Sequence, residues 1–159
     1  MRSSRVLGVV LVVVAVGAGR SYPGPGNPDG ACSLVTREEA STALGAPVPA
    51  GSEKAMKLPL QGATIDAQYC FYGSEVIVAR FELGPNAPAT FGQYRRSLAT
   101  EEGYRSLDGV GDEAFIAKGQ LAARRGQTGL IIDVGQARGG GAKEEAAEKT
   151  LALGAIARM

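Results

Sequence analysis

The residues best suited to chemistry in this 159-residue chain are two cysteines, Cys32 and Cys70, and a cluster of carboxylates. The chain has no histidine, which excludes Ser-His-Asp and Cys-His catalysis and every metal site that needs imidazole. Two cysteines cannot by themselves hold a structural zinc ion, and these two lack the Cys-x-x-Cys spacing of a redox-active pair. We therefore expect no metal and no cofactor.

The carboxylates are close together in the sequence: Glu101, Glu102, Asp108, Asp112 and Glu113. Two of them at the right separation could hydrolyse a glycoside without histidine. However, the chain has no Trp, five Tyr and four Phe, whereas sugar sites usually stack the ring on aromatic faces. Acidic residues at turns and helix ends are also ordinary solvated groups. A cofactor-free hydrolase that uses the carboxylates of Asp108–Glu113 is the alternative function.

A glycine-rich stretch in the same region has the letters of a dinucleotide-binding fingerprint: Gly109, Gly111 and Ala114, with Asp133 about twenty residues later. That fingerprint needs a buried strand before it and a helix after it. Here the preceding segment is not a buried strand, and a strand-like segment follows. The sequence favours a turn that glycine permits, formed by Gly109, Gly111 and Asp112.

Several helices and strands must position these groups. Thr36 and Glu39 have the spacing of a capping box, and Gly45 before Pro47 is a stop signal, so a short helix is expected between them. The hydrophobic periodicity predicts helices over 36–45, 90–99 and 143–157, and strands over 68–71, 75–83, 113–118, 120–125 and 129–134. The three prolines and weak periodicity of 46–62 predict a loop.

Runs of strands with separate helices predict an α+β fold: an antiparallel sheet built from hairpins and a meander, with short helices packed on one face. If the other face is open, Tyr72, Val76 and Val78 would form an exposed apolar patch, which would mark a partner site. The pairs Arg95-Arg96 and Arg124-Arg125 form small basic spots that neighbouring acids balance.

The first 18 residues have the layout of a secretory signal peptide: two arginines, an apolar and glycine run over 6–18, and small residues up to Ala18. Residues 19–31 are rich in Pro and Gly and predict a flexible tether. The remaining 32–158 fit a single domain. With 17 basic against 16 acidic residues, the chain lacks the basic excess of a nucleic-acid binder.

Export would permit a disulfide, and two cysteines allow one pairing, Cys32 with Cys70. In the chain-entropy model, closing this loop of about 39 residues stabilises the fold by at most roughly 4 kcal/mol. A structural cross-link is therefore the favoured interpretation.

An ordered series of short motifs extends along the domain: Cys-Ser-Leu-Val-Thr at 32–36, Ala-Leu-Gly at 43–45, Tyr-Cys-Phe-Tyr at 69–72 and Gly-Val-Gly-Asp-Glu-Ala-Phe at 109–115. This series resembles the small exported proteins and lipoproteins of unknown function common in actinobacteria and other high-GC bacteria. The resemblance covers about 31–158. It implies an envelope or extracellular location, a Cys32–Cys70 disulfide and an α+β fold, and it carries no catalytic residues. Unlike the lipoproteins, this chain has no cysteine directly after its apolar run.

These observations together predict an exported, non-catalytic module of the cell envelope or extracellular space. Its expected partner is an envelope protein or a small ligand, not nucleic acid. Contact with a membrane is expected only in transit, through the signal peptide. The expected location is secreted, periplasmic or cell envelope.

Overall fold

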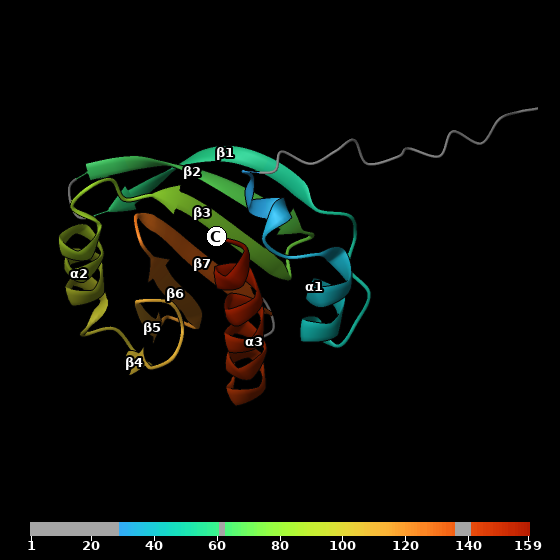
Figure 1. Ribbon diagram of the computed structural model, residues 1–159. Helices are drawn as coiled ribbons and strands as arrows, with labels where there is room; N and C mark the ends of the chain where they lie inside the picture. Colours follow the sequence, from blue (N-terminus) through green and yellow to red (C-terminus); the bar gives the residue numbers. More distant parts are fainter. Residues whose placement is uncertain (1–28, 61–62, 136–140) are drawn as a thin grey trace, which may run out of the picture.

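The computed structural model describes residues 29–60, 63–135 and 141–159. These ranges form one antiparallel sheet in the order β1-β2-β3-β7-β6-β5-β4, with three α-helices and a short 3-10 helix (Figure 1). The strands are β1 (Ser52–Leu60), β2 (Ala63–Tyr72), β3 (Val76–Glu82), β4 (Arg105–Leu107), β5 (Glu113–Ala117), β6 (Gln120–Arg125) and β7 (Thr128–Val134). The helices are η1 (Ala31–Ser33), α1 (Arg37–Leu44), α2 (Ala87–Leu98) and α3 (Ala142–Arg158). The predicted α+β class is thus confirmed.

The first α-helix begins and ends at the residues that the sequence indicates. The Thr36 hydroxyl accepts a hydrogen bond from the Glu39 N–H at 3.1 Å, and the Glu39 carboxylate accepts one from the Thr36 N–H at 2.8 Å. Gly45 follows in the left-handed conformation with φ 72°, and its N–H donates to the Ser41 carbonyl. Glycine adopts this conformation without a Cβ penalty, so α1 ends there.

Two antiparallel meanders build the sheet, and α2 connects them. The first contains β1, β2 and β3, and the second contains β4 to β7. The second ends in the middle of the sheet, where β7 pairs with β3 from Val76 opposite Val134 to Glu82 opposite Thr128. The two strands that join in the middle of the sheet, β3 and β7, therefore come from different meanders.

The expected loop over 46–62 is wrong, because β1 occupies Ser52–Leu60. This strand lies at the edge of the sheet and pairs along its length with β2 alone. Most of its side chains are exposed, so it lacks the alternating burial that reveals a strand in a sequence. Pro59 is tolerated there because an edge strand has backbone groups with no ladder partner. The three-residue β4 lies at the other edge, and its mostly exposed side chains likewise give no alternating pattern in the sequence.

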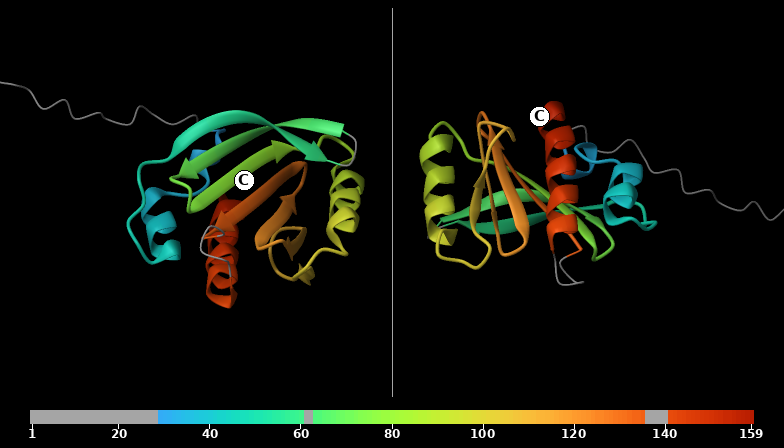
Figure 2. Two further views of the ribbon diagram at one scale, coloured as in Figure 1. Left: turned by 180° about the vertical axis from the view of Figure 1, so that it is seen from behind. Right: turned by 90° about the horizontal axis from the view of Figure 1, so that it is seen from below.

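The helices do not all pack on one face of the sheet, contrary to expectation. Alternate residues of β3 and β7, such as Val78 and Ile132, join the hydrophobic cluster that contains residues of α1 and α3. The residues between them, such as Phe81 and Ile131, join a second cluster with Phe91 of α2. Since successive strand residues point to opposite faces, α2 covers the face opposite α1 and α3. Figure 2 shows strands of the second meander between α2 and α3.

The predicted signal peptide (1–18) and most of the predicted tether (19–31) lie outside the described residues. The last tether residues already belong to the fold, because Gly30 and Ala31 are buried and Ala31 begins η1. In the described ranges, no helix has the length and apolar character needed to span a membrane.

Candidate interaction surface

The two cysteines form the predicted disulfide. Cys32 is the middle residue of η1, and Cys70 is fully buried in β2. Their Cα atoms are 4.9 Å apart. The start of β1 passes so close that a Cβ on Gly51 would lie 2.7 Å from the Cys70 sulfur. The disulfide therefore fastens η1 to the sheet, as a structural cross-link would.

A second set of contacts fastens the same segment to the end of the chain. Arg158 donates to the Leu34 carbonyl at 2.6 Å and to both oxygens of Glu39 at 2.5 and 2.9 Å. Mainly because of the hydrogen bonds from Arg158, the pKa of Glu39 is lowered to about 2. The buried Tyr72 hydroxyl donates to the Val35 carbonyl, and burial is the main cause that raises the pKa of Tyr72 to about 12. The first and last helices are thus held together.

The predicted turn motif, Gly109, Gly111 and Asp112, lies just before β5 and contacts the β6–β7 hairpin. Gly109 and Gly111 have φ of 77° and 61°, and a Cβ on Gly111 would collide with the Arg124 carbonyl oxygen. The Asp112 N–H donates to that same carbonyl at 2.7 Å. The Asp112 carboxylate accepts from the Arg124 guanidinium at 3.0 Å and from the Gly126 N–H at 2.8 Å. A strand and not a helix follows, which agrees with the turn interpretation of these glycines.

Most of the carboxylates that a hydrolase would use are paired with basic side chains. Glu113 lies 2.9 Å from Arg124 and 3.6 Å from Arg95, and Glu101 lies 3.2 Å from Lys118. Neither of two surface hollows, of about 500 and 490 Å³, is lined by any of the five carboxylates. The arrangement gives Asp112 and Glu113 a clear role in holding the turn.

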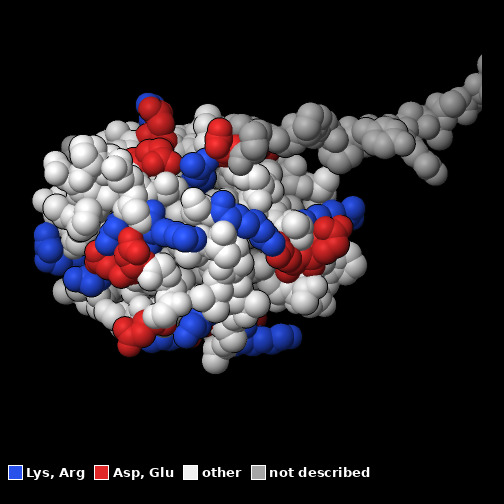
Figure 3. Space-filling model, viewed as in Figure 1, with Lys and Arg blue, Asp and Glu red and all other residues white. Residues whose placement is uncertain are grey.

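The Arg124-Arg125 pair does not form a basic surface spot. Arg124 is 7% exposed, and its guanidinium serves the turn motif. Arg125 donates to the Ile156 carbonyl at the end of α3, at 2.6 Å. Figure 3 shows acidic and basic side chains next to one another across the viewed face.

An apolar surface does exist on the sheet, but not where the sequence placed it. Tyr72, Val76 and Val78 are 2%, 0% and 0% exposed in the cluster with α1 and α3. Their neighbours Phe71 and Ile77 point to the opposite face and are half-buried. The sequence shows which alternate residues share a face of the sheet. It does not show which of the two faces the helices cover.

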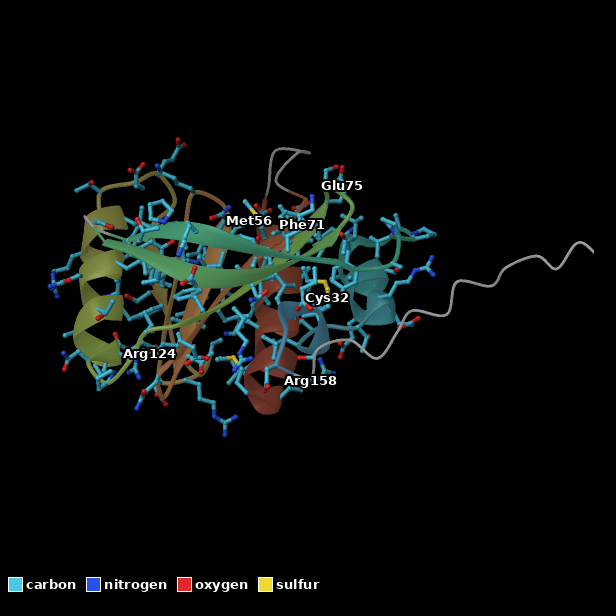
Figure 4. All side chains as sticks on the ribbon, turned by 90° about the horizontal axis from the view of Figure 1, so that it is seen from above. Cys32, Met56, Phe71, Glu75, Arg124 and Arg158 are labelled. Atoms are coloured by element: carbon cyan, nitrogen blue, oxygen red, sulfur yellow. A yellow bond between two sulfur atoms is a disulfide. The ribbon has the colours of Figure 1, made fainter. Side chains whose placement is uncertain are left out.

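We call this surface the aromatic face: Lys54, Met56, Tyr69, Phe71 and Ile77. Its residues come from three adjacent strands, with Lys54 opposite Tyr69 and Phe71 opposite Ile77. The Tyr69 and Phe71 rings stack with centroids 5.8 Å apart, and the Lys54 ammonium lies 5.6 Å from the Phe71 centroid. Met56 is 45% exposed. Figure 4 shows Met56 and Phe71 close together, on the side of the view away from Arg158.

The aromatic face is open because α2 covers the other part of its side of the sheet. Phe91 and Tyr94 of α2 pack on Phe115 of β5, with ring centroids 5.5 Å from it in each case. Phe81 lies in the same cluster, and its ring leaves no room for a Cβ at Gly129. Met56, Phe71 and Ile77 are outside this cluster, whereas Tyr69 packs against it.

The second feature with functional interest is the hollow of about 500 Å³ between α1 and α3. Ala43, Ala147, Leu151 and Gly154 are part of its apolar lining, and the charged Glu38 and Lys143 also line it. The hollow of about 490 Å³ lies over β2 and β3, where the polar or charged side chains of Asp66, Gln68 and Arg80 are part of its lining.

Comparison of the chain with protein-family models, with curated proteins and with solved structures found no match.

Proposed function

We propose that this protein is an exported, non-catalytic module of the cell envelope or extracellular space, and that it binds a protein partner through the aromatic face. The observation that carries the proposal is this apolar surface, which no described helix covers. Contiguous apolar surface on a folded protein is typical of an interaction site. Its side-chain types, Tyr, Phe and Met, are those enriched at protein interfaces.

The shape and chemistry of the aromatic face favour a protein over a small ligand. Its residues lie side by side on one face of β1, β2 and β3, whereas small-molecule sites are concave. Burial raises the pKa of Tyr69, and a tyrosine hydroxyl can donate a hydrogen bond to a partner. Lys54 places a cation next to the Phe71 ring, which suits a partner with an acidic group beside an apolar one.

Export is supported by the signal-peptide pattern and by the disulfide, since disulfides persist mainly in oxidising compartments. The test is an intact mass of the protein collected from its host, before and after reduction. We expect a chain that begins at Gly19 and gains two hydrogens on reduction. A chain that keeps 1–18, or one that carries acyl chains, would overturn secretion as a free protein.

Binding is tested by a photo-crosslinking amino acid placed at Met56 in the protein produced by its host. The control position is Asp66, which is also highly exposed but pairs across β1 and β2 with Lys57, on the opposite face. We expect a defined adduct from Met56 and none from Asp66, and loss of the adduct when Phe71→Asp is added. Equal labelling at both positions, or none, would contradict binding at the aromatic face.

A further inference from the structure

The outer side of α3 is unusual for a helix at a protein surface. Ala146, Thr150, Leu153 and Ala157 are all exposed and follow one another at spacings of four, three and four residues, and Lys149 is the charged residue exposed among them. A surface helix normally presents charged and polar residues on this side. Leu153 is 45% exposed, and the Thr150 hydroxyl already donates to the Ala146 carbonyl at 3.0 Å. Removing these four side chains from water therefore has a low desolvation cost.

The groove between α1 and α3 continues this surface, and we call it the helix groove. Ala43, Ala147, Leu151 and Gly154 line it. Small side chains allow another pair of helices to approach closely, at axial distances of about 8–10 Å. Figure 1 shows α1 and α3 beside each other, and Figure 3 shows a mostly uncharged surface over α3.

The helix groove has an acidic end and a basic end. Arg158 binds Glu39, so the start of α1 lies beside the end of α3, and Glu38 belongs to that end. Lys143 lies at the other end, within 3.9 Å of a Cβ built on Gly45. In the described part of the chain, neither Glu38 nor Lys143 has an ion-pair partner.

A surface with this polarity is complementary to itself when it is turned around. If two copies face each other with their α3 helices antiparallel, Lys143 of each copy meets Glu38 of the other, and the contact occurs twice. From Lys143 to Gly154 the groove is about 16 Å long at 1.5 Å per residue. This exceeds the screening length of about 8 Å at physiological salt, so the two ends act separately. A parallel arrangement would oppose like charges at both ends.

We propose that two copies of this protein form a two-fold symmetric dimer through the helix groove. The α1 and α3 helices of the two copies form a four-helix cluster, in which Ala147, Thr150 and Gly154 make the close contacts. Symmetric pairs are the commonest soluble assemblies, and they bury the same patch on both subunits. The dimer leaves the aromatic face free on each copy, so it presents two copies of the proposed partner site.

The test is sedimentation velocity of the disulfide-bonded mature chain over a range of concentrations. We expect a monomer–dimer equilibrium that Thr150→Arg shifts at least 100-fold toward monomer, because a charged side chain then lies at the centre of the contact. Circular dichroism should stay unchanged, and so should the Tm at a concentration at which both proteins are monomeric, since Thr150 is exposed. A matched control is Thr100→Arg, the same change at an exposed position just after α2, on the other side of the sheet, which should leave the equilibrium unchanged.

Exchanging the charges of Glu38 and Lys143 tests whether the two copies pack with their α3 helices antiparallel. Glu38→Lys and Lys143→Glu should each weaken the dimer about 10-fold, because each places like charges at both ends. The double variant should restore the affinity, because it recreates both pairs with reversed signs. A monomer at every concentration, a dimer that tolerates Thr150→Arg, or a double variant no tighter than either single variant would overturn the proposal. Phe71→Asp should not affect the dimer, which keeps this test independent of the aromatic face.

Discussion

The backbone N–H of Val134 donates a hydrogen bond of 3.0 Å to the carboxylate of Glu148, a residue of α3 that is fully buried. The pairing of β6 with β7 ends at Leu121 opposite Ile132, so Val134 lies beyond the last pair of that ladder. Glu148 supplies the acceptor that the next strand does not. In the described part of the chain, its other carboxylate oxygen is buried with no hydrogen-bond partner.

This relationship predicts that stability falls as pH rises. Burial, the main cause, together with Asp133 and Glu145, raises the pKa of Glu148 to about 8 from the ordinary 4.5. Between these values the folded protein keeps a proton that the unfolded chain releases, so the free energy of unfolding decreases by up to about 1.4 kcal/mol per pH unit. Glu148→Gln keeps the size of the side chain and the acceptor for Val134, and should remove this dependence.

Urea unfolding at pH 5 and pH 8 checks the prediction. The native protein should lose stability between the two values, and Glu148→Gln should lose much less. Glu102→Gln, at an exposed position in the turn before β4, is the matched control and should behave like the native protein, because Glu102 is not among the charges that raise the pKa of Glu148. An equal pH effect in the native protein and in Glu148→Gln would show that Glu148 is not responsible.

The network around Arg124 predicts a structural effect where a hydrolase would show a catalytic one. Arg124→Ala removes the shared partner of Asp112 and Glu113 and should lower the free energy of unfolding by about 2 kcal/mol. Asp112→Asn and Glu113→Gln should each lower it by about 1 kcal/mol. Arg96→Ala, at an exposed position on α2, is the control and should change it little.

Denaturant unfolding measures these changes. The hydrolase alternative makes the opposite prediction for the two amide variants, namely loss of a hydrolytic activity with an unchanged Tm. That pair of results would refute a structural role for Asp112 and Glu113.

The two glycines of the turn motif should tolerate substitution unequally. Both have positive φ, so an added Cβ is strained at either. At Gly109 nothing lies within 4 Å of the added atom, and Gly109→Ala should cost about 1 kcal/mol. At Gly111 the Cβ meets the Arg124 carbonyl oxygen, so Gly111→Ala should cost at least twice as much because the hairpin must move. A thermal melt of the two variants compares them, and equal Tm values would contradict the contact with the hairpin.

Loss of the Cys32–Cys70 disulfide should destabilise the protein by roughly 2–4 kcal/mol. The double variant Cys32→Ala, Cys70→Ala removes the cross-link. Its unfolding midpoint in urea should equal that of the reduced native protein, apart from the small effect of the two missing sulfur atoms. The double variant should not respond to reductant, whereas the native protein should. If reduction leaves the native midpoint unchanged, the contacts of Arg158 and Tyr72 suffice to hold η1 and α1 in place.

Local signals in the sequence predicted local structure well. The capping box of Thr36 and Glu39, the stop at Gly45 and the turn glycines depend on residues a few positions apart, so their chemistry can be read directly. The disulfide needed one further step, since two cysteines have one possible pairing. The strands β3, β5, β6 and β7 were recognisable as short, largely apolar segments between turn residues, because both of their faces are buried or nearly so.

Contacts between residues far apart in the sequence determined the features that local signals did not predict, namely β1 and the open face of the sheet. The strand β1 exists because β2 offers it a partner, and its own exposed side chains do not indicate it. The periodicity of β2 and β3 shows that Phe71 and Ile77 share one face and Tyr72 and Val76 share the other. Which face is covered depends on where α2 and α3 lie, and distant contacts such as Phe91 with Phe115 and Arg158 with Glu39 determine that. The sequence thus determined which residues share a surface, and only the tertiary structure decided which surface remained open, because helix placement is a property of the whole packed chain.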